Sequence, residues 1–127
     1  MQRRRVLVVD DDDLTLDILR TILDLEEFDV VTARDGEEAL GFLAADRFDI
    51  VVLDVMMPGL DGFAVCRRIK GDPQTADVPV ILLTAKDRRE DIEAGHEAGA
   101  EAYLTKPFSP LALIETLNRF GLGRKRS

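Results

Sequence analysis

Five short runs of apolar and β-branched residues recur along the chain, each bounded by polar or turn-forming residues. Runs of this kind are typical of strands that are buried on both faces. We predict strands at residues 6–9, 30–33, 50–53, 80–83 and 102–104. The intervals between them are long enough to hold a helix after each strand.

The segments after these runs place apolar residues three or four positions apart, which is the period of a helix with one buried face. We predict five helices, marked by Leu14, Ile18, Ile22 and Leu25, by Ala39, Leu40 and Leu43, by residues 63–69, by residues 92–98, and by Leu111, Ile114 and Leu117. Ser109 and Pro110 mark the start of the fifth helix, because serine caps helices and proline is favoured in their first turn.

The strict alternation of strand and helix determines the expected fold class. Right-handed crossovers place helices on both faces of a parallel sheet, and strands covered on both faces are apolar throughout. We therefore expect an α/β fold with a doubly wound, five-stranded parallel sheet. Ligands of such folds bind beyond the carboxyl ends of the strands, so the residues that end the strands are the candidates for chemistry.

The length and composition fit one compact unit. The chain has 127 residues, of which 46% are hydrophobic and 33% are charged, a balance that is typical of a globular domain. We expect one domain over residues 1–127, with a core at about 5–119 and a tail or the start of a linker at 120–127. The basic segments 3–5 and 124–126 are interpreted as solvated ends.

Charge and hydropathy narrow the possible partners. The net charge of −8 argues against binding of nucleic acid, because phosphate contacts need lysine and arginine. No apolar run approaches the ~20 residues that span a bilayer, and no secretory signal is recognised, so we expect a cytoplasmic protein without membrane contact. Cys66, the only cysteine, is expected to be a buried structural thiol. His96, the only histidine, is expected on the surface of a helix.

Acidic residues end two of the predicted strands. Asp10, Asp11, Asp12 and Asp13 follow the first strand, and Asp54 follows the third. Carboxylates that converge repel one another unless a cation lies between them, and a shallow oxygen site suits magnesium better than calcium. Asp12 or Asp13 has a second explanation, because an acid at the start of a helix caps it and complements its dipole.

A hydroxyl and an ammonium lie at the ends of two further strands. Thr84 follows the fourth strand and Lys106 follows the fifth. Taken singly, Thr84 could cap the next helix and Lys106 could be solvated. Taken with the carboxylates, they supply what phosphoryl transfer to a carboxylate requires: a nucleophile, a metal and donors for the phosphoryl oxygens. The Lys106–Pro107 bond is expected to be cis, which would aim the lysine into the pocket.

These strand ends belong to four short motifs. The motifs are Val8-Val9-Asp10-Asp11, Leu53-Asp54-Val55-Met56-Met57-Pro58-Gly59, Leu83-Thr84-Ala85 and Tyr103-Leu104-Thr105-Lys106-Pro107-Phe108. In this order and spacing they resemble the receiver domains of bacterial two-component response regulators. The resemblance implies a flavodoxin-like strand order of 2-1-3-4-5 and a signalling switch rather than an enzyme. It also implies phosphorylation of Asp54 by a sensor histidine kinase or a small phosphodonor.

The resemblance implies a role for each acidic residue of the pocket. Mg²⁺ would bind to Asp11, to Asp54 and to the backbone carbonyl of Met56. Asp10 would act mainly through a water molecule bound to the metal. Receiver domains also adjust the lifetime of the acyl phosphate through the residues at positions 56 and 86. The apolar Met56 cannot orient a water molecule, so we expect slow self-dephosphorylation, although Met56 could equally be a packing residue; Lys86 is the second such position.

The resemblance also implies a switch at the far side of the pocket. Lys106 would pair with the acceptor carboxylate and then with the phosphoryl group, and Thr84 would donate a hydrogen bond to a phosphoryl oxygen. Thr84 would move inward, and Tyr103 would swing into the space that it leaves. The simpler alternative is an aromatic ring that packs at the edge of the sheet without moving.

Several functions remain open from the sequence. The chain could be a stand-alone switch for a downstream protein partner, or the receiver of a longer protein with a covalently linked output domain, and phosphorylation could cause homodimerisation. It could instead be a binding module that works without phosphorylation. A metal-dependent hydrolase with Asp54 as nucleophile would need a further acid, base and substrate pocket, for which no candidate residues are found.

Overall fold

The computed structural model describes residues 3–124 and the side chains of residues 3–120. The strands are β1 (Arg5–Val9), β2 (Asp29–Ala33), β3 (Ile50–Leu53), β4 (Val80–Thr84) and β5 (Ala102–Thr105). The helices are α1 (Asp13–Leu25), α2 (Gly36–Ala45), α3 (Gly62–Gly71), α4 (Arg89–Glu97) and α5 (Pro110–Arg124). Every strand and helix that the apolar pattern predicts is therefore present, in the predicted order.

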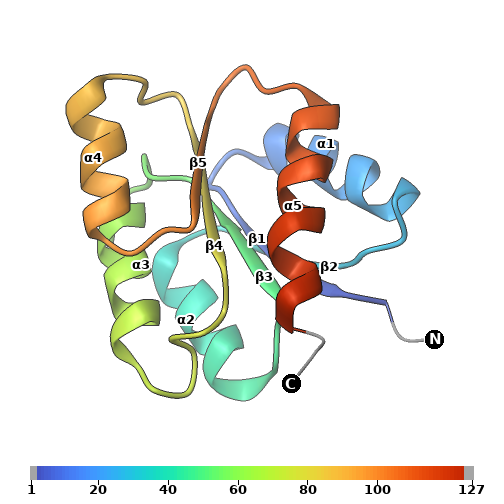
Figure 1. Cartoon of the computed structure of the whole chain (residues 1–127), viewed down its shortest axis with the longest axis horizontal. Helices are drawn as coiled ribbons and strands as arrows, with labels where there is room; N and C mark the ends of the chain where they lie inside the picture. The colour runs from blue at the N-terminus through green and yellow to red at the C-terminus, as the bar shows by residue number, and fades with distance from the viewer. Residues whose placement is uncertain (1–2, 125–127) are drawn as a thin grey trace.

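The five strands form one parallel sheet in the order β2-β1-β3-β4-β5 (Figure 1). This order confirms the doubly wound α/β fold. In β1, Val6 pairs with Val30 of β2 on one side and with Ile50 of β3 on the other. Strand β2 follows β1 on one side of it, whereas β3 lies on its other side, so the strand order reverses between β1 and β3. The crevice at such a point is where open α/β sheets bind ligands. The two strands that end in acidic residues therefore meet at the favoured place.

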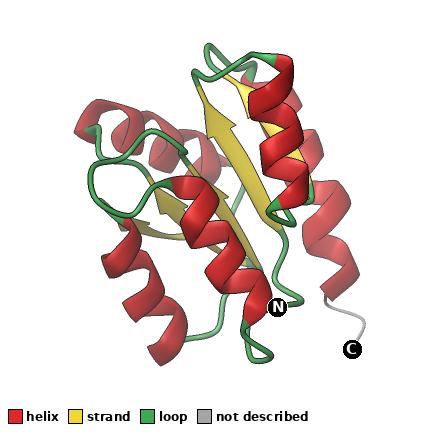
Figure 2. Ribbon diagram, turned by 90° about the vertical axis from the view of Figure 1, so that its left-hand side faces the viewer, coloured by secondary structure: helices red, strands yellow, loops and turns green. Residues whose placement is uncertain are grey.

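The sheet separates two apolar cores, with helices on each side of it (Figure 2). Along β1, Val6 and Val8 join the core under α1 and α5, whereas Leu7 and Val9 join the core under α2, α3 and α4. Successive side chains of a strand point to opposite faces. Because both faces of β1 are buried from Val6 to Val9, this part of the strand is apolar, as the sequence indicated.

Polar side chains cap most of the helices at their amino-terminal ends. A side-chain oxygen accepts a hydrogen bond from a backbone N–H of the first turn in four helices: Asp12 from Thr15 at 3.3 Å, Asp35 from Glu38 at 2.8 Å, Asp61 from Ala64 at 2.9 Å, and Ser109 from Ala112 at 3.2 Å. The capping roles predicted for Ser109 and for one of Asp12 and Asp13 are confirmed. These caps satisfy N–H groups that have no partner inside the helix.

The basic segment at residues 3–5 is not a solvated end, so that interpretation was wrong. The Arg3 Nε donates to the carbonyl of Glu27 at 2.8 Å, just past the end of α1. The Arg4 guanidinium lies 4.5 Å from the centre of the Phe28 ring, and its Nη2 donates to Asn118 Oδ1 of α5 at 2.7 Å. Carbonyls at the end of a helix and aromatic faces both attract cations. The arginines therefore hold the start of β1 against two helices.

The opposite end of the chain also differs from expectation. Helix α5 continues to Arg124, past residue 119 where the core was expected to end. Residues 125–127, the rest of the expected tail and of the second basic segment, lie outside the described residues. Among residues 3–124, no helix combines the length and the apolar character needed to cross a lipid bilayer.

Two residues outside the strand ends lie where the sequence predicted them. Cys66 is buried on α3, and burial raises the pKa of its thiol to about 11. A thiol with such a pKa is protonated at neutral pH and is a poor nucleophile, which agrees with a structural role. His96 is exposed on α4.

Candidate functional site

The acidic residues converge because β1 and β3 are neighbours in the sheet. Val9 pairs with Leu53, and the N–H of Asp54 donates to the Val9 carbonyl at 2.9 Å. The next residues, Asp10 and Asp54, therefore lie side by side and are buried, whereas Asp11 is exposed. Carboxylate oxygens of these three aspartates lie within 4.8 Å of one another. A hard divalent cation with oxygen ligands fits such a cluster.

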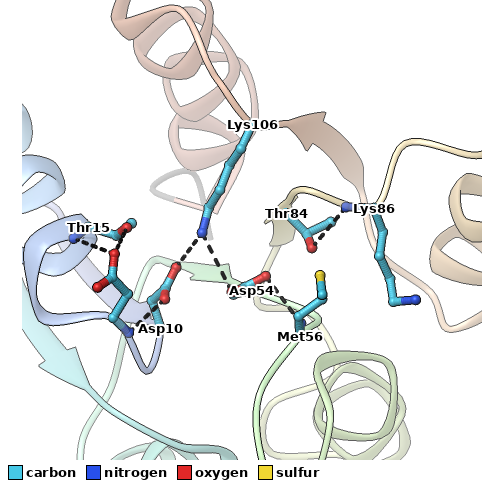
Figure 3. Close-up of polar contacts among 8 residues, drawn as sticks. Asp10, Thr15, Asp54, Met56, Thr84, Lys86 and Lys106 are labelled. Atoms are coloured by element: carbon cyan, nitrogen blue, oxygen red, sulfur yellow. Dashed lines mark hydrogen bonds and ion pairs between the residues drawn. The ribbon is translucent and has the colours of Figure 1, made fainter.

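Lys106 provides a positive charge in this cluster (Figure 3). Its Nζ lies 2.7 Å from Asp10 Oδ2 and 3.5 Å from Asp54 Oδ2, so Asp10 is the closer partner. The Lys106–Pro107 bond is cis, as predicted. Both carboxylates are almost inaccessible to solvent, with 3% and 7% of their side-chain surfaces exposed. The ammonium therefore compensates charge that water cannot reach.

Burial and ion pairing shift the pKa in opposite directions, both for Asp10 and for Lys106. Burial raises the pKa of the Asp10 carboxyl, and the hydrogen bond from Lys106 only partly offsets this. Burial also lowers the pKa of the Lys106 ammonium, but the hydrogen bond to Asp10 and the charge of Asp54 outweigh it, so this pKa is raised. The lysine thus remains charged at neutral pH, next to a carboxyl group whose pKa is raised by burial.

Thr84 is fully buried at the end of β4, the strand next to β3. Its hydroxyl lies on the Asp54 side of the pocket (Figure 3) and accepts a hydrogen bond from the N–H of Lys86 at 3.4 Å. The next helix, α4, begins only after Arg88, so the alternative that Thr84 caps this helix is wrong. The hydroxyl is available to donate toward a group on Asp54.

The loop after β3 positions Asp54 through its backbone. The N–H of Met56 donates to Asp54 Oδ1 at 3.2 Å, and the N–H of Gly62, the first residue of α3, donates to the Val55 carbonyl at 3.0 Å. A side chain at position 62 would overlap the Asp54 carbonyl oxygen and place its Cβ 2.6 Å from the Val55 Cα. Only glycine permits this close approach. The Met56 side chain is 53% exposed beside the pocket.

Gly62 was not identified from the sequence. The available signal was a capping aspartate, Asp61, followed at once by a glycine that is a poor helix former. This signal marks the start of a helix but does not tell which backbone lies against it.

Lys86 does not point its side chain into the pocket. Its Nζ lies 3.8 Å from Asp91 of α4, away from Asp54 (Figure 3). Its carbonyl instead accepts a hydrogen bond from the Tyr103 hydroxyl at 2.8 Å. Tyr103 is half-buried, so its ring already lies against the protein on the α4 side of the sheet. Lys86 therefore contacts Tyr103 through its backbone carbonyl. Its ammonium does not contact the acidic cluster.

Comparison with known proteins finds a matching family model and similar chains. The family model described as the response regulator receiver domain matches residues 6–118. The response regulator PleD from Caulobacter vibrioides is 48% identical over 121 residues, which cover 93% of this chain and 27% of PleD. The chain therefore spans only about a quarter of the length of this curated relative.

Solved structures share the fold. The receiver domain of a signal transduction histidine kinase from Syntrophus aciditrophicus superposes with a TM-score of 0.92 and 35% identity, covering 98% of this chain and 94% of that one. The receiver domain of a sensor histidine kinase from Pseudomonas aeruginosa, with a magnesium ion coordinated in its active site cleft, has a TM-score of 0.88 and 29% identity over 94% of this chain and 98% of its own. With the family match over almost the whole described chain, these likenesses show that the protein belongs to the receiver domain family of two-component response regulators.

Proposed function

We propose that this chain is a phosphorylation switch in which Asp54 accepts a phosphoryl group from a sensor histidine kinase or a small phosphodonor. The observation that carries the proposal is the nearly buried Asp54 carboxylate, held between two other aspartates and the ammonium of Lys106. In the transfer, an Asp54 oxygen forms a bond to phosphorus while the bond from phosphorus to the donor nitrogen or oxygen breaks. We expect the switch to act in the cytoplasm, within a single domain.

Mg²⁺ fits the donor set of the pocket. Asp11, Asp54 and the backbone carbonyl of Met56 would hold the ion, with Asp10 acting through a bound water molecule, as the resemblance implies. When bound, Mg²⁺ would neutralise charge on the phosphoryl oxygens. The oxygen ligands and the partial exposure of the cluster through Asp11 support this ion.

Two side chains would stabilise the transferred group. Lys106 already lies within ion-pair distance of Asp54 and would move its hydrogen bond from Asp10 to a phosphoryl oxygen. The buried hydroxyl of Thr84 would donate a second hydrogen bond. Preorganised donors of this kind stabilise the charge of the transition state, because they need little rearrangement.

The output of the switch would be a change of partner interactions. Phosphorylation adds charge and strong acceptors, and it biases an equilibrium between two conformations. The responding partner would be a separate protein, an output domain in the same polypeptide or a second copy of this chain. No substrate other than the phosphodonor is needed, so the chain would catalyse only its own phosphorylation and dephosphorylation.

The test is the intact mass of the protein after incubation with acetyl phosphate and Mg²⁺. One phosphoryl adduct is expected for the parent chain and for Asp17→Asn, which removes an exposed carboxylate of α1 outside the cluster. No adduct is expected for Asp54→Asn, or for the parent with a chelator. An adduct on Asp54→Asn would overturn the assignment of the acceptor. Absence of an adduct from the parent, with no binding of beryllofluoride, would favour a module that works without phosphorylation.

The exposed Met56 predicts a long-lived acyl phosphate. Hydrolysis needs a water molecule oriented toward phosphorus, and a thioether accepts hydrogen bonds only weakly. After removal of acetyl phosphate, the adduct of the parent is expected to persist for minutes or longer. Met56→Asn should shorten its half-life several-fold, and the apolar control Met56→Leu should leave it unchanged. Mass spectrometry over time measures the decay, and loss from the parent within seconds would contradict the prediction.

A further inference from the structure

Helix α4 contains a glycine at a position where side chains of β4 and β5 lie close to its backbone. Gly95 is its only buried residue within Arg89–Glu97. A Cβ at this position would lie 2.7 Å from Cδ2 of Tyr103 and 2.9 Å from Cδ1 of Leu82. Such separations are shorter than real Cβ contacts allow. The ring of Tyr103, together with the end of the Leu82 side chain, therefore occupies the space that a side chain at position 95 would need.

Neither helix formation nor backbone conformation explains this glycine. Glycine costs about 1 kcal/mol relative to alanine in a helix interior. Unlike Gly59 and Gly99, Gly95 has no positive φ that would favour glycine. Gly41 of α2 provides a contrast, because a Cβ there would meet no atom within 4 Å. The close contacts with Tyr103 and Leu82 are the remaining physical reason for glycine at position 95.

The position of the Tyr103 ring links α4 to the functional site. Its hydroxyl donates to the carbonyl of Lys86 at 2.8 Å, and the N–H of the same residue donates to the hydroxyl of Thr84. Lys86, in the loop after β4, is thus bound through its N–H to the buried Thr84 and through its carbonyl to Tyr103. A displacement of the ring would break the contact with Lys86.

We propose that Gly95 is a positioning residue that sets the inward position of Tyr103. The space left by its missing side chain holds the ring where phosphorylation of Asp54 can act on it through Thr84 and Lys86. This inference rests on the proposed function for its link to phosphorylation, but the steric part does not. A methyl group at position 95 would displace the ring from α4 and from the Lys86 carbonyl. The surface formed by α4 and β5 would then no longer respond to the state of Asp54.

The chain offers a clean reporter for the steric part, because it has one tyrosine and no tryptophan. Tyrosine fluorescence and the single resonance of incorporated 3-fluorotyrosine therefore report on residue 103 alone. Gly95→Ala should at least double the quenching of this fluorescence by acrylamide at neutral pH and should shift the fluorine resonance. The matched control, Gly41→Ala, should leave both unchanged. Parent-like values for Gly95→Ala would overturn the proposal.

A double substitution keeps the test valid if Gly95→Ala is poorly folded. Gly95→Ala should lower the midpoint of urea unfolding in the parent chain, because the methyl group meets the ring. In a Tyr103→Ala background the same change should lower the midpoint clearly less, because the ring is gone and only Leu82 of β4 still lies close to position 95. An equal decrease in both backgrounds would show that the ring is not what position 95 accommodates.

The link to phosphorylation is read out separately. Beryllofluoride with Mg²⁺ should shift the fluorine resonance of Tyr103 in the parent and in Gly41→Ala, but at most slightly in Gly95→Ala. Acetyl phosphate labelling of the same samples measures chemistry at Asp54. A labelled Gly95→Ala that retains the full beryllofluoride response would overturn the proposal. An unlabelled parent would instead count against the phosphoacceptor function and leave the steric result intact.

Discussion

Gly62→Ala is expected to lower the free energy of unfolding by about 3 kcal/mol and to slow the Mg²⁺-dependent labelling of Asp54 by acetyl phosphate. The added methyl group would overlap the Asp54 carbonyl oxygen and crowd the Val55 Cα. Both are backbone atoms, which cannot move aside as the end of a flexible side chain can. Either α3 or the loop after β3 must shift. This loop, called the acceptor loop below, carries both Asp54 and the carbonyl of Met56.

Urea denaturation measures the first effect, and the rate of adduct formation at a temperature where the variant is folded measures the second. Gly71→Ala is the matched control, because it lies at the other end of α3 and its Cβ would meet no atom within 4 Å. We expect this control to label at the parent rate and to differ in stability by at most ~1 kcal/mol. Parent-like stability of Gly62→Ala would mean that α3 does not lie against the acceptor loop.

Lys106→Met is expected to destabilise the protein by about 2 kcal/mol at neutral pH without divalent cations. Loss of one partner from a buried pair typically costs 3–5 kcal/mol, and the 23% exposure of the lysine side chain reduces this figure through solvent screening. The methionine keeps most of the apolar stem of the side chain. The loss is therefore assigned to the uncompensated charges of Asp10 and Asp54.

The destabilisation should depend on pH in a defined direction. The folded-state pKa of Asp10 is raised above its ordinary value of 3.8, so this group stabilises the fold most at acid pH and loses that contribution as pH rises through the raised pKa. Removal of the ammonium raises the pKa further and enlarges the loss. The pKa of Lys106 is raised above 10.5, so its contribution in the parent persists up to alkaline pH.

The difference between parent and Lys106→Met should accordingly be small near the ordinary pKa of aspartate and largest around neutrality. Urea denaturation across this range measures it. Added Mg²⁺ should reduce the difference, because a divalent cation would replace the missing ammonium. Lys70→Met, which removes a lysine bound to Glu101 at 2.6 Å outside the site, controls for the loss of a lysine pair. Its destabilisation should not respond to Mg²⁺. A constant difference for Lys106→Met at all pH values would contradict the electrostatic explanation.

The topology and the members of the site were predictable because they depend on local patterns. Short apolar runs separated by helix-period segments allow few arrangements other than a parallel sheet. The residues that end parallel strands meet at one edge, so Asp10, Asp54, Thr84 and Lys106 could be grouped without coordinates. The grouping does not specify which pairs touch, and the closer contact of Lys106 with Asp10 appears only in the structure.

The features that were missed depend on contacts between distant segments. Gly62 is required because the backbone of the acceptor loop lies against it, and Gly95 because the ring of Tyr103 does. No sequence pattern near either glycine indicates these neighbours. The basic residues at the start of the chain were misinterpreted for the same reason. Their partners, the end of α1, the ring of Phe28 and Asn118 of α5, are determined by packing and not by adjacent sequence.

The contact between Arg4 and Asn118 has a consequence for how this domain can be combined with others. It brings the beginning of β1 and the last turns of α5 together at the edge of the sheet opposite the aspartates. A fusion partner joined through either of these segments would be attached on the side of the sheet away from the aspartates. The described unit could also be inserted into a surface loop of a host protein, since domain insertion requires that the segments entering and leaving the domain lie close together, as those around Arg4 and Asn118 do.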